Sequence, residues 1–268
     1  LAQRALDGGA TTVLSLGGDG THNEVVNGLM TAGARPDEVA FGVLPSGTGG
    51  DFRRVLEHGS SLAESAAAIG RPGGVPTTVI DVGHIAYRTD AGAEAARWFL
   101  NLSGAGMSGH VDRLVNGSSK RLGGRLVFLS GTLRGLMSYR PPRVRVFVDG
   151  REVGEWWLTT LVAGNSRWAG GGMMLAPGAR LADGLLEIVV FEAAPTLKSM
   201  LLTPKLYDGS HVHTDIVHRF EGVEVRVEVL EGEAPAVDID GESPGRMPVV
   251  IRAVPGALRL LDLNPRFA

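Results

Sequence analysis

The chain has 268 residues, enough for one large domain or for two smaller ones with real cores. Hydrophobic residues make up 44% and charged residues 21%, as in soluble globular proteins. The sequence has no cysteine, which excludes disulfides and cysteine–zinc sites. Its net charge of −3 argues against a general nucleic-acid-binding protein, and no uninterrupted apolar run approaches the roughly 20 residues of a membrane span.

The first 30 residues begin with a helix-like segment and continue as a strand, a glycine turn and a second helix. Val13–Leu16 is a short apolar run typical of a buried strand. The turn Gly17–Gly20 has almost no side chains apart from Asp19. Glycines let a phosphate approach the backbone, and the free N–H groups at the start of the next helix point toward it. The Asp19 carboxylate beside such a site favours a bridging cation such as Mg²⁺.

A ligand-free explanation covers part of this stretch. Thr21 and Glu24 have the spacing of a capping box, in which two side chains satisfy backbone N–H groups at a helix start. That explanation does not account for three glycines around an aspartate. The turn is not a Walker phosphate loop, because no Gly-Lys-Ser/Thr follows it.

Residues 39–56 repeat the arrangement. Val39–Leu44 is a second apolar run, residues 45–51 (PSGTGGD) form a glycine-rich loop, and Phe52–Leu56 is helix-like. Two strand–loop–helix units predict a parallel sheet with helices on its faces and a ligand edge at the carboxyl ends of the strands. Asp51 also has a simple structural explanation as an N-cap.

The pattern of the sequence changes near residue 83. A helix at Leu62–Ile69 and a strand at Thr77–Val82, which carries Asp81, precede that point. Beyond it strands dominate, apart from one helix predicted at Lys120–Tyr139. The predicted strands are His84–Tyr87, Arg97–Ser103, Arg143–Val148, Trp156–Ala163, Leu185–Glu192, Val223–Leu230 and Val249–Ala253.

These elements predict an α/β plus β fold. We expect an N-terminal α/β nucleotide-binding domain at residues 1–83 and a C-terminal antiparallel β-sandwich-like domain at residues 84–250. Residues 251–268 are expected to return to the first domain. The active site is expected in the cleft between the domains, where ligand sites commonly form.

Residues 113–148 contain eight basic residues and no Asp or Glu. A solvated helix face with exposed strand positions explains this pattern without a partner. The alternative is a basic surface that faces anionic lipid headgroups, where each basic residue contributes ~1 kcal/mol. The basic residues are Arg113, Lys120, Arg121, Arg125, Arg134, Arg140, Arg143 and Arg145.

Several stretches together resemble one family. Residues 17–29 read GGDGTHNEVVNGL, residues 45–54 read PSGTGGDFRR, residues 164–187 read GNSRWAGGGMMLAPGARLADGLLE, and residues 240–242 read DGE. These motifs resemble those of the catalytic domain of the diacylglycerol kinase family, which includes sphingosine and ceramide kinases and bacterial lipid kinases. The resemblance covers essentially the whole chain. The second stretch departs from the family motif PxGTxNDFAR, because Gly50 replaces the Asn and Arg53 replaces the Ala. Gly50 lacks the side-chain amide of the Asn, which could contact the nucleotide.

The resemblance implies transfer of the γ-phosphoryl group of ATP to the hydroxyl of a lipid such as diacylglycerol, with Mg²⁺ as cofactor. It implies Glu242 as the general base, with Asp240 beside it. It implies Asp19 at the catalytic Mg²⁺, helped by Asp51 or Asp81. The implied nucleotide-binding residues are Gly17, Gly18, Asp19, Gly20, Thr21, His22, Asn23, Glu24, Thr48 and Asp51.

In bacterial members a second Mg²⁺ site is of structural importance. Carried over, it consists of the Asp183 carboxylate with the backbone carbonyls of Arg180 and Leu185, hard oxygen ligands that suit this ion. The resemblance also implies a cytoplasmic enzyme that contacts the inner membrane face peripherally. The family normally has an earlier strand and helix, so we expect this chain to be a fragment or a truncated form.

Two other functions remain open at this point. NAD kinases share the wording GGDGT, although the matches after residue 40 are those of the lipid kinases. The chain is alternatively a non-catalytic fragment that binds a nucleotide or a lipid, because the family draws part of its ATP site from the missing strand and helix.

Overall fold

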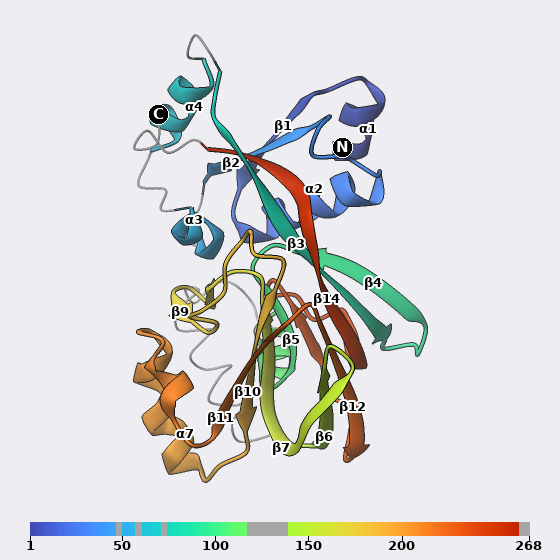
Figure 1. Ribbon diagram of the computed structural model, residues 1–268, viewed down its shortest axis with the longest axis vertical. Coiled ribbons are helices and arrows are strands. Elements are labelled where there is room, and N and C mark those ends of the chain that lie inside the picture. Colours follow the sequence, from blue (N-terminus) through green and yellow to red (C-terminus); the bar gives the residue numbers. More distant parts are fainter. Residues whose placement is uncertain (47–49, 57–60, 71–73, 117–138, 263–268) are drawn as a thin grey trace.

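The computed structural model describes residues 1–46, 50–56, 61–70, 74–116 and 139–262 (Figure 1). The helices are α1 (Ala2–Asp7), α2 (Asp19–Thr31), α3 (Asp51–Val55), α4 (Leu62–Ile69), α5 (Met107–Asn116) and α7 (Thr196–Leu202), followed by the 3₁₀ turns η2 (Thr203–Leu206) and η3 (Ser210–His213). Within these ranges, none of the helices has the length and apolar character needed to cross a bilayer.

The strands come in two groups along the chain. The first group is β1 (Thr12–Gly17), β2 (Ala40–Pro45), β3 (Thr77–Thr89), β4 (Glu94–Phe99) and β5 (Leu102–Gly106). The second group is β6 (Arg143–Val148), β7 (Arg151–Gly164), β8 (Trp168–Ala169), β9 (Met173–Met174), β10 (Leu186–Glu192), β11 (Val217–Gly222), β12 (Glu224–Glu231), β13 (Val237–Ile239) and β14 (Gly245–Leu261).

The N-terminal part is a mixed sheet with helices packed on it. β1, β2 and the end of β14 run parallel, and β3 runs antiparallel to β14. Val26 and Leu29 of α2 are fully buried in one core with Phe41 of β2 and Ile80 of β3. The two predicted strand–loop–helix units are therefore confirmed. The sheet is mixed and not wholly parallel, because the last strand of the chain enters it beside β2 and brings β3 in as its antiparallel neighbour.

The C-terminal part is an antiparallel β-sandwich-like body. β14, β12, β6, β7, β10 and β11 are neighbours in that order, and β5 joins β7 to β13. Alternate residues of a strand face the same side, so Val144 and Val146 of β6 and Val225 and Val227 of β12 are all fully buried in one core. The predicted fold class, an α/β part followed by an antiparallel β part, is confirmed.

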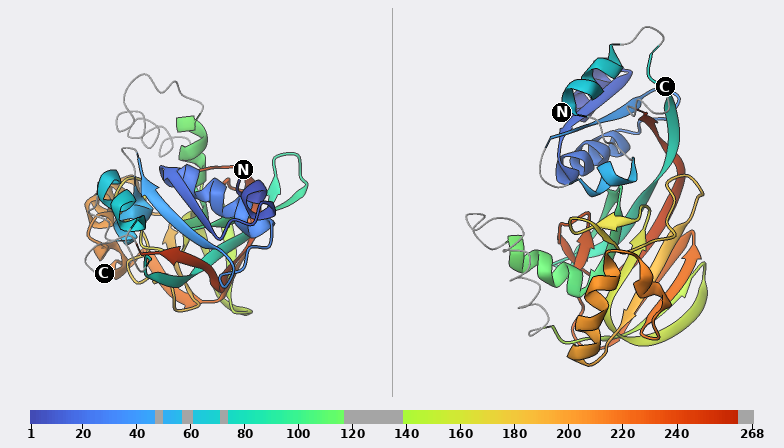
Figure 2. Two further views of the ribbon diagram at one scale, coloured as in Figure 1. Left: turned by 90° about the horizontal axis from the view of Figure 1, so that it is seen from above. Right: turned by 90° about the vertical axis from the view of Figure 1, so that its left-hand side faces the viewer.

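Two long strands connect the two parts. β3 and β14 lie side by side along the longest axis of the molecule, from the sandwich to the N-terminal sheet (Figures 1 and 2). β3 passes residue 83 without interruption, and the end of β14 pairs with β2 through Arg259 and Leu260. The domain boundaries placed at residues 83 and 250 stay predictions.

One predicted strand is divided in the structure. Residues 97–103 belong to two strands, since β4 ends at Phe99 and β5 begins at Leu102. The chain breaks there because the N–H groups of Leu100, Asn101 and Leu102 bind the Asp240 carboxylate. The helix predicted at Lys120–Tyr139 lies almost entirely outside the described residues.

Candidate active site

The glycine turn joins β1 to α2. The helix begins at Asp19, with an extended Gly18 as its N-cap. A Cβ on Gly17 would lie 2.6 Å from Thr21 Oγ1, so a larger residue does not fit there. A Cβ on Gly18 or Gly20 would meet no other described atom within 4 Å. The first N–H groups of a helix have no partner within it, so this turn presents open backbone donors of the kind that bind phosphates.

The predicted capping box at the start of α2 is wrong. The helix starts two residues before Thr21, so Thr21 and Glu24 lie within its first two turns, and both are exposed. A capping box is present at α4, where Ser61 Oγ accepts the N–H of Glu64 at 3.2 Å and the Glu64 carboxylate accepts the N–H of Ser61 at 2.6 Å. Helix capping therefore does not explain Thr21 and Glu24.

His22 lies on the buried side of α2. Its Nδ1 is 2.8 Å from Ser15 Oγ on β1. Burial lowers the pKa of His22, although the negative charge of Asp19 acts in the opposite direction. The structure thus places His22 between helix and sheet and away from the open side of the glycine turn. Its contact with a nucleotide stays a prediction.

Asn23 and Asn27 connect α2 to the sandwich. Asn23 Nδ2 donates to the Trp98 carbonyl at 3.0 Å and to Asp240 Oδ2 at 2.8 Å. Asn27 Nδ2 donates to the same carbonyl at 2.9 Å, and Asn27 Oδ1 accepts the N–H of Trp98 at 3.0 Å. One helical turn separates the two asparagines, so both side chains reach the same edge of β4. The spacing Asn-x-x-x-Asn therefore serves to fix the helix that follows the glycine turn.

Asp240 stands at the centre of this connection. With Gly241 it forms a two-residue hairpin turn, in which both φ values are positive (48° and 84°) and Ile239 and Glu242 exchange both backbone hydrogen bonds. Residues 239–242 therefore form a turn, and Asp238, Asp240 and Glu242 do not share one face as they would in an extended strand.

The Asp240 carboxylate is enclosed by four N–H donors. Oδ1 accepts the N–H groups of Asn101 and Leu102, both at 3.0 Å, and Oδ2 accepts those of Leu100 and of the Asn23 amide, both at 2.8 Å. Burial raises the pKa of Asp240 to about 6, while these four donors act in the opposite direction. The carboxylate thus holds the turn, the break between β4 and β5, and helix α2 in one arrangement.

Glu242 follows this turn and faces a cleft. Its Oε2 lies 2.5 Å from a guanidinium nitrogen of Arg97 on β4, and its side chain is 45% exposed. The cleft has a volume of about 520 Å³, and its described lining consists of Gly20, Asp240, Gly241, Glu242, Ser243 and Pro244. The structure therefore brings Gly20 of the glycine turn and Glu242 to one cleft, although 222 positions separate them in the sequence.

Asp19 and Asp51 form an acidic pair at the start of α3. The Asp19 carboxylate accepts the N–H groups of Asp51 at 3.0 Å and Phe52 at 3.1 Å. The Asp51 carboxylate accepts the N–H of Gly171 at 2.8 Å and pairs with Arg54 at 2.9 Å. Burial raises the pKa of Asp51, and the charge of Asp19 adds to this effect. The two glycine-rich loops of the N-terminal part are thus joined to the glycine-rich loop of the sandwich.

Asp81 is a buried connector. Its Oδ1 accepts the N–H of Gly256 at 2.8 Å and its Oδ2 accepts that of Gly184 at 2.7 Å. Its own N–H donates to the Leu181 carbonyl at 2.6 Å, and its carbonyl accepts Asn165 Nδ2 at 3.1 Å. These bonds fasten β3 to the 181–184 turn and to the bend of β14. Ligation of a metal by Asp81 stays a prediction.

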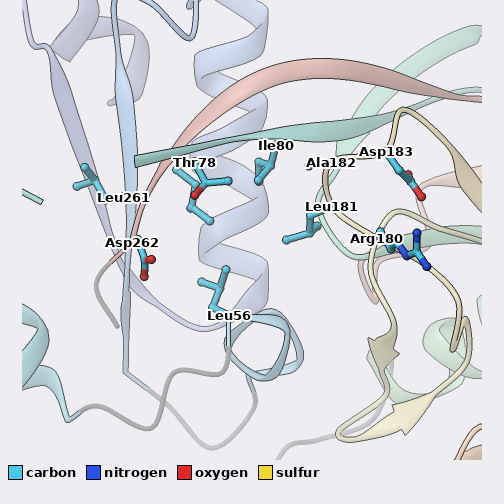
Figure 3. Close-up of a pocket in the computed structure, with 10 residues that line it drawn as sticks. Leu56, Thr78, Ile80, Arg180, Leu181, Ala182, Asp183, Leu261 and Asp262 are labelled. Carbon is cyan, nitrogen blue, oxygen red and sulfur yellow. The ribbon is translucent and has the colours of Figure 1, made fainter. Parts of the chain in front are cut away.

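The turn at Arg180–Leu185 carries the other proposed metal ligands. Asp183 is exposed, and its Oδ1 accepts the N–H of Leu185 at 3.1 Å, while Gly184 adopts a positive φ of 76°. Arg180 and Asp183 line a cavity of about 470 Å³, together with apolar side chains from β3, from β14, from the 181–184 turn and from Leu56 at the end of α3 (Figure 3). The described lining is Leu56, Thr78, Ile80, Arg180, Leu181, Ala182, Asp183, Leu260, Leu261 and Asp262.

The chain matches two family models that together cover most of its length. Residues 1–84 match the diacylglycerol kinase catalytic domain, and residues 102–262 match the YegS C-terminal NAD kinase beta sandwich-like domain. A diacylglycerol kinase of Mycobacterium tuberculosis is 32% identical over 266 residues, which span 97% of this chain and 80% of that relative. The chain belongs to the diacylglycerol kinase family.

Other members of the diacylglycerol kinase family are similar over much of the chain. A probable lipid kinase YegS-like of Pseudomonas aeruginosa is 32% identical over 97% of this chain and 79% of its own length. A diacylglycerol kinase of Bacillus subtilis is 30% identical over 88% of this chain and 72% of its own length. A crystal structure of a putative diacylglycerol kinase from Bacillus anthracis matches the fold with a TM-score of 0.72 at 24% identity, over 100% of this chain and 83% of that one. The resemblance seen in the sequence is confirmed, and a lipid kinase is the activity that these relatives support.

Two arginines have roles at this site that the sequence did not indicate, although Arg113 was named in the predicted basic surface. Arg97 binds Glu242, and Arg113 of α5 binds Ser243 Oγ at 2.9 Å and the Gly245 carbonyl at 2.8 Å. Both hold the segment that follows the Asp240 turn. Arg97 stands in an ordinary strand pattern with no nearby motif, so no local signal marks it.

Only part of the predicted basic surface at residues 113–148 lies within the described residues. Arg113 pairs with Asp90, and Arg143 and Arg145 both pair with Glu155. Three of its eight charges are thus balanced by carboxylates on neighbouring strands and loops. Lys120, Arg121, Arg125 and Arg134, and the proposed nucleotide residue Thr48, lie outside the described residues.

Proposed function

We propose that the protein transfers the γ-phosphoryl group of ATP to the hydroxyl of a lipid, with diacylglycerol as the leading acceptor. The observation that supports this proposal is the shared cleft, which is lined by Gly20 of the glycine turn and by Glu242. A phosphate site and a carboxylate base at one cleft are what phosphoryl transfer to an alcohol requires.

The chain's own residues supply positioning and proton transfer. The open backbone at Gly18 and Gly20 would hold the phosphates, because helix N–H groups attract anions. Glu242 would accept the proton of the attacking hydroxyl, and Arg97, 2.5 Å from its Oε2, would fix the direction in which the carboxylate points. Asp240 would act through the turn geometry, since its oxygens are already engaged by four donors.

Two places in this chain would suit Mg²⁺ by the chemistry of their oxygen ligands. The carboxylates of Asp19 and Asp51 are close enough to raise the pKa of Asp51 beyond the effect of burial, and a divalent cation would relieve this repulsion. The exposed Asp183 carboxylate in a tight turn, with the Arg180 and Leu185 carbonyls nearby in the chain, offers hard oxygen ligands for a second ion. When bound, Mg²⁺ would neutralise charge on the transferring phosphoryl group.

The same proposal places the enzyme in the cytoplasm, at the inner face of the membrane. The basic residues within 113–148 would face anionic headgroups. Reversal of the charges of Lys120, Arg121 and Arg125 should weaken sedimentation with anionic vesicles, because each basic residue at such a surface contributes ~1 kcal/mol. Arg145→Gln is the control, since Arg145 is already paired with Glu155. Equal sedimentation of the reversed variant and the wild type would remove the basic surface from the account.

The test of the function is ATP consumption by purified protein with Mg²⁺ and a panel of lipid alcohols in mixed micelles, with NAD included. Glu242→Gln should lose turnover by about 10²–10⁴-fold, the usual contribution of a general base, and should retain ATP binding. Glu94→Gln serves as the matched control, because Glu94 is an exposed carboxylate of β4, paired with Arg88 and not with Arg97. Phosphorylation of NAD would favour the NAD kinase alternative, and ATP binding with no acceptor would favour the non-catalytic alternative.

A further inference from the structure

Large apolar side chains are exposed together on α7 and the turn that follows it. Leu197 is 71% exposed, Leu201 67%, Met200 57% and Tyr207 55%. Residues three and four positions apart lie on one side of a helix, so Leu197, Met200 and Leu201 share a face. Single exposed leucines are common in soluble proteins, whereas a contiguous apolar patch indicates an interaction surface.

The opposite side of this segment is apolar as well. Leu202 and Leu206 pack on a core formed by Val189 and Phe191 of β10 and by neighbouring residues. The inward leucines thus fasten α7 and η2 to the sandwich. The outward apolar side chains take no part in that fastening, because the described residues leave most of their surface open to solvent.

An exposed tryptophan lies on the strand beside the segment that leads into α7. The Trp157 carbonyl on β7 accepts the N–H of Ala193 at 2.7 Å, three residues before α7 begins, and Trp157 is 47% exposed. Tryptophan and tyrosine have an apolar ring with a polar hydrogen-bonding group, and both concentrate where a bilayer meets water. Trp157 and Tyr207 are therefore suited to that boundary.

We propose that this α7 surface, which consists of Trp157, Leu197, Met200, Leu201 and Tyr207, inserts into the headgroup–acyl boundary of a lipid bilayer. The proposal rests on the proposed function, because an enzyme that phosphorylates a membrane lipid has to meet the bilayer. Leucine and methionine side chains on one face of α7, with aromatic side chains on neighbouring segments, have the composition of interfacial anchors.

The charges of residues 196–215 indicate that the α7 surface would bind a membrane by apolar insertion and not by attraction to anionic lipid. Residues 196–215 contain two lysines and two aspartates, so their formal charge is zero with neutral histidines. Lys198 is paired with Asp215 at 2.6 Å. This segment therefore has no net charge with which to attract an anionic surface, and the driving force of the proposed insertion is the transfer of apolar side chains out of water. Binding through α7 is expected to be insensitive to salt and to the fraction of anionic lipid.

A second copy of the chain is a poorer occupant of this surface. Five residues, between 47% and 71% exposed, present an apolar area on the order of 300–600 Å². A stable dimer usually needs about 800 Å² from each partner. A bilayer has no such minimum, because each inserted side chain adds its own transfer free energy.

The experiment compares a variant of α7 with a matched control at the other end of the molecule. The variant is Leu197→Ser with Leu201→Ser. The control is Leu62→Ser on α4, because Leu62 is also an exposed helical leucine (42%) and α4 lies at the opposite end of the longest axis from α7 (Figure 1). Partition into neutral phosphatidylcholine vesicles that contain diacylglycerol is measured by sedimentation at low and high salt. Quenching of tryptophan emission by brominated lipid provides a second readout.

We expect the wild type and the Leu62 variant to bind equally at both salt concentrations and the double variant to bind at least about tenfold more weakly. Quenching should fall in Trp157→Phe. Equal binding of the double variant and the wild type would overturn the proposal, as would the absence of any wild-type binding. A change from dimer to monomer in the double variant, with vesicle binding unchanged, would assign the surface to a second copy.

Kinase activity separates this proposal from the proposed function. With a short-chain diacylglycerol in solution below its micelle concentration, the double variant should phosphorylate as fast as the wild type. If neither protein phosphorylates any lipid, the proposed function fails, while the vesicle measurement still decides whether α7 binds a bilayer.

Discussion

The four hydrogen bonds to Asp240 give the sharpest test of how the cleft is held. Asp240→Ala leaves the N–H groups of Leu100, Asn101, Leu102 and the Asn23 amide without their acceptor. A buried donor that loses its partner costs ~1–3 kcal/mol. Since Asp240 also lines the cleft, water can reach part of the site. We therefore expect a loss of about 3–5 kcal/mol in the free energy of unfolding.

Asp149→Ala is the matched control. Asp149 stands in an equivalent Asp-Gly turn with the same φ of 48°, and its Oδ1 accepts the N–H groups of Val223 and Glu224, at an exposed site. Both substitutions place alanine in the left-handed region, which costs about 1–2 kcal/mol. The difference between the two variants therefore isolates the buried hydrogen bonds.

The assay is denaturant unfolding followed by tryptophan fluorescence at pH 8. Asp240→Asn should give an intermediate loss, because one oxygen and two of the four hydrogen bonds remain. If Asp240→Ala lowered the free energy of unfolding by no more than Asp149→Ala, the enclosed carboxylate would not be what holds the turn, and the account of the cleft would be refuted.

Two further predictions concern pH and Arg97. Burial is the largest cause of a lowered pKa at His22, His84 and His211, so these groups bind protons more readily in the unfolded chain. Asp240, with its pKa raised to about 6, and Asp51 act in the opposite direction, and the three histidines outnumber them. The free energy of unfolding should therefore fall as the pH drops below about 6.5, and a flat or rising profile between pH 7.5 and 6 in denaturant titrations would contradict this. Arg97→Gln should lower kcat more than it changes the KM for ATP, because the Glu242 carboxylate loses its ion pair and can turn away from the cleft. An unchanged kcat in steady-state kinetics would show that Arg97 does not position Glu242.

The local elements near the glycine turn could be predicted because their chemistry is local. The apolar run, the glycines and the apolar face of α2 lie within 18 consecutive residues, so strand, turn and helix follow from spacing alone. The start of the helix does not follow from spacing, because Thr21 and Glu24 have the spacing of a capping box while α2 begins two residues earlier, at Asp19.

The long-range part of the site could not be predicted in the same way. Asn23 meets Asp240 across 217 positions, and Arg97 meets Glu242 across 145. No periodicity connects such residues, because their contact depends on β14 returning to the N-terminal sheet. Only the family motif marks Glu242 in the sequence, and no motif marks its partner Arg97.

The break between β4 and β5 illustrates the same limit. Residues 97–103 have the composition of one strand, and only the carboxylate of Asp240 on a distant turn explains why three successive N–H groups leave the sheet pattern. Tertiary context overrides local propensity at that point.

The most direct test of the central claim is the formation of a phosphorylated lipid from ATP by the wild type and by Glu242→Gln. The account predicts that the wild type phosphorylates one lipid alcohol of the panel with Mg²⁺ and that Glu242→Gln, with ATP binding intact, loses most of this turnover. Normal turnover in Glu242→Gln would contradict the role assigned to the shared cleft, and phosphorylation of NAD in place of a lipid would contradict the proposed acceptor.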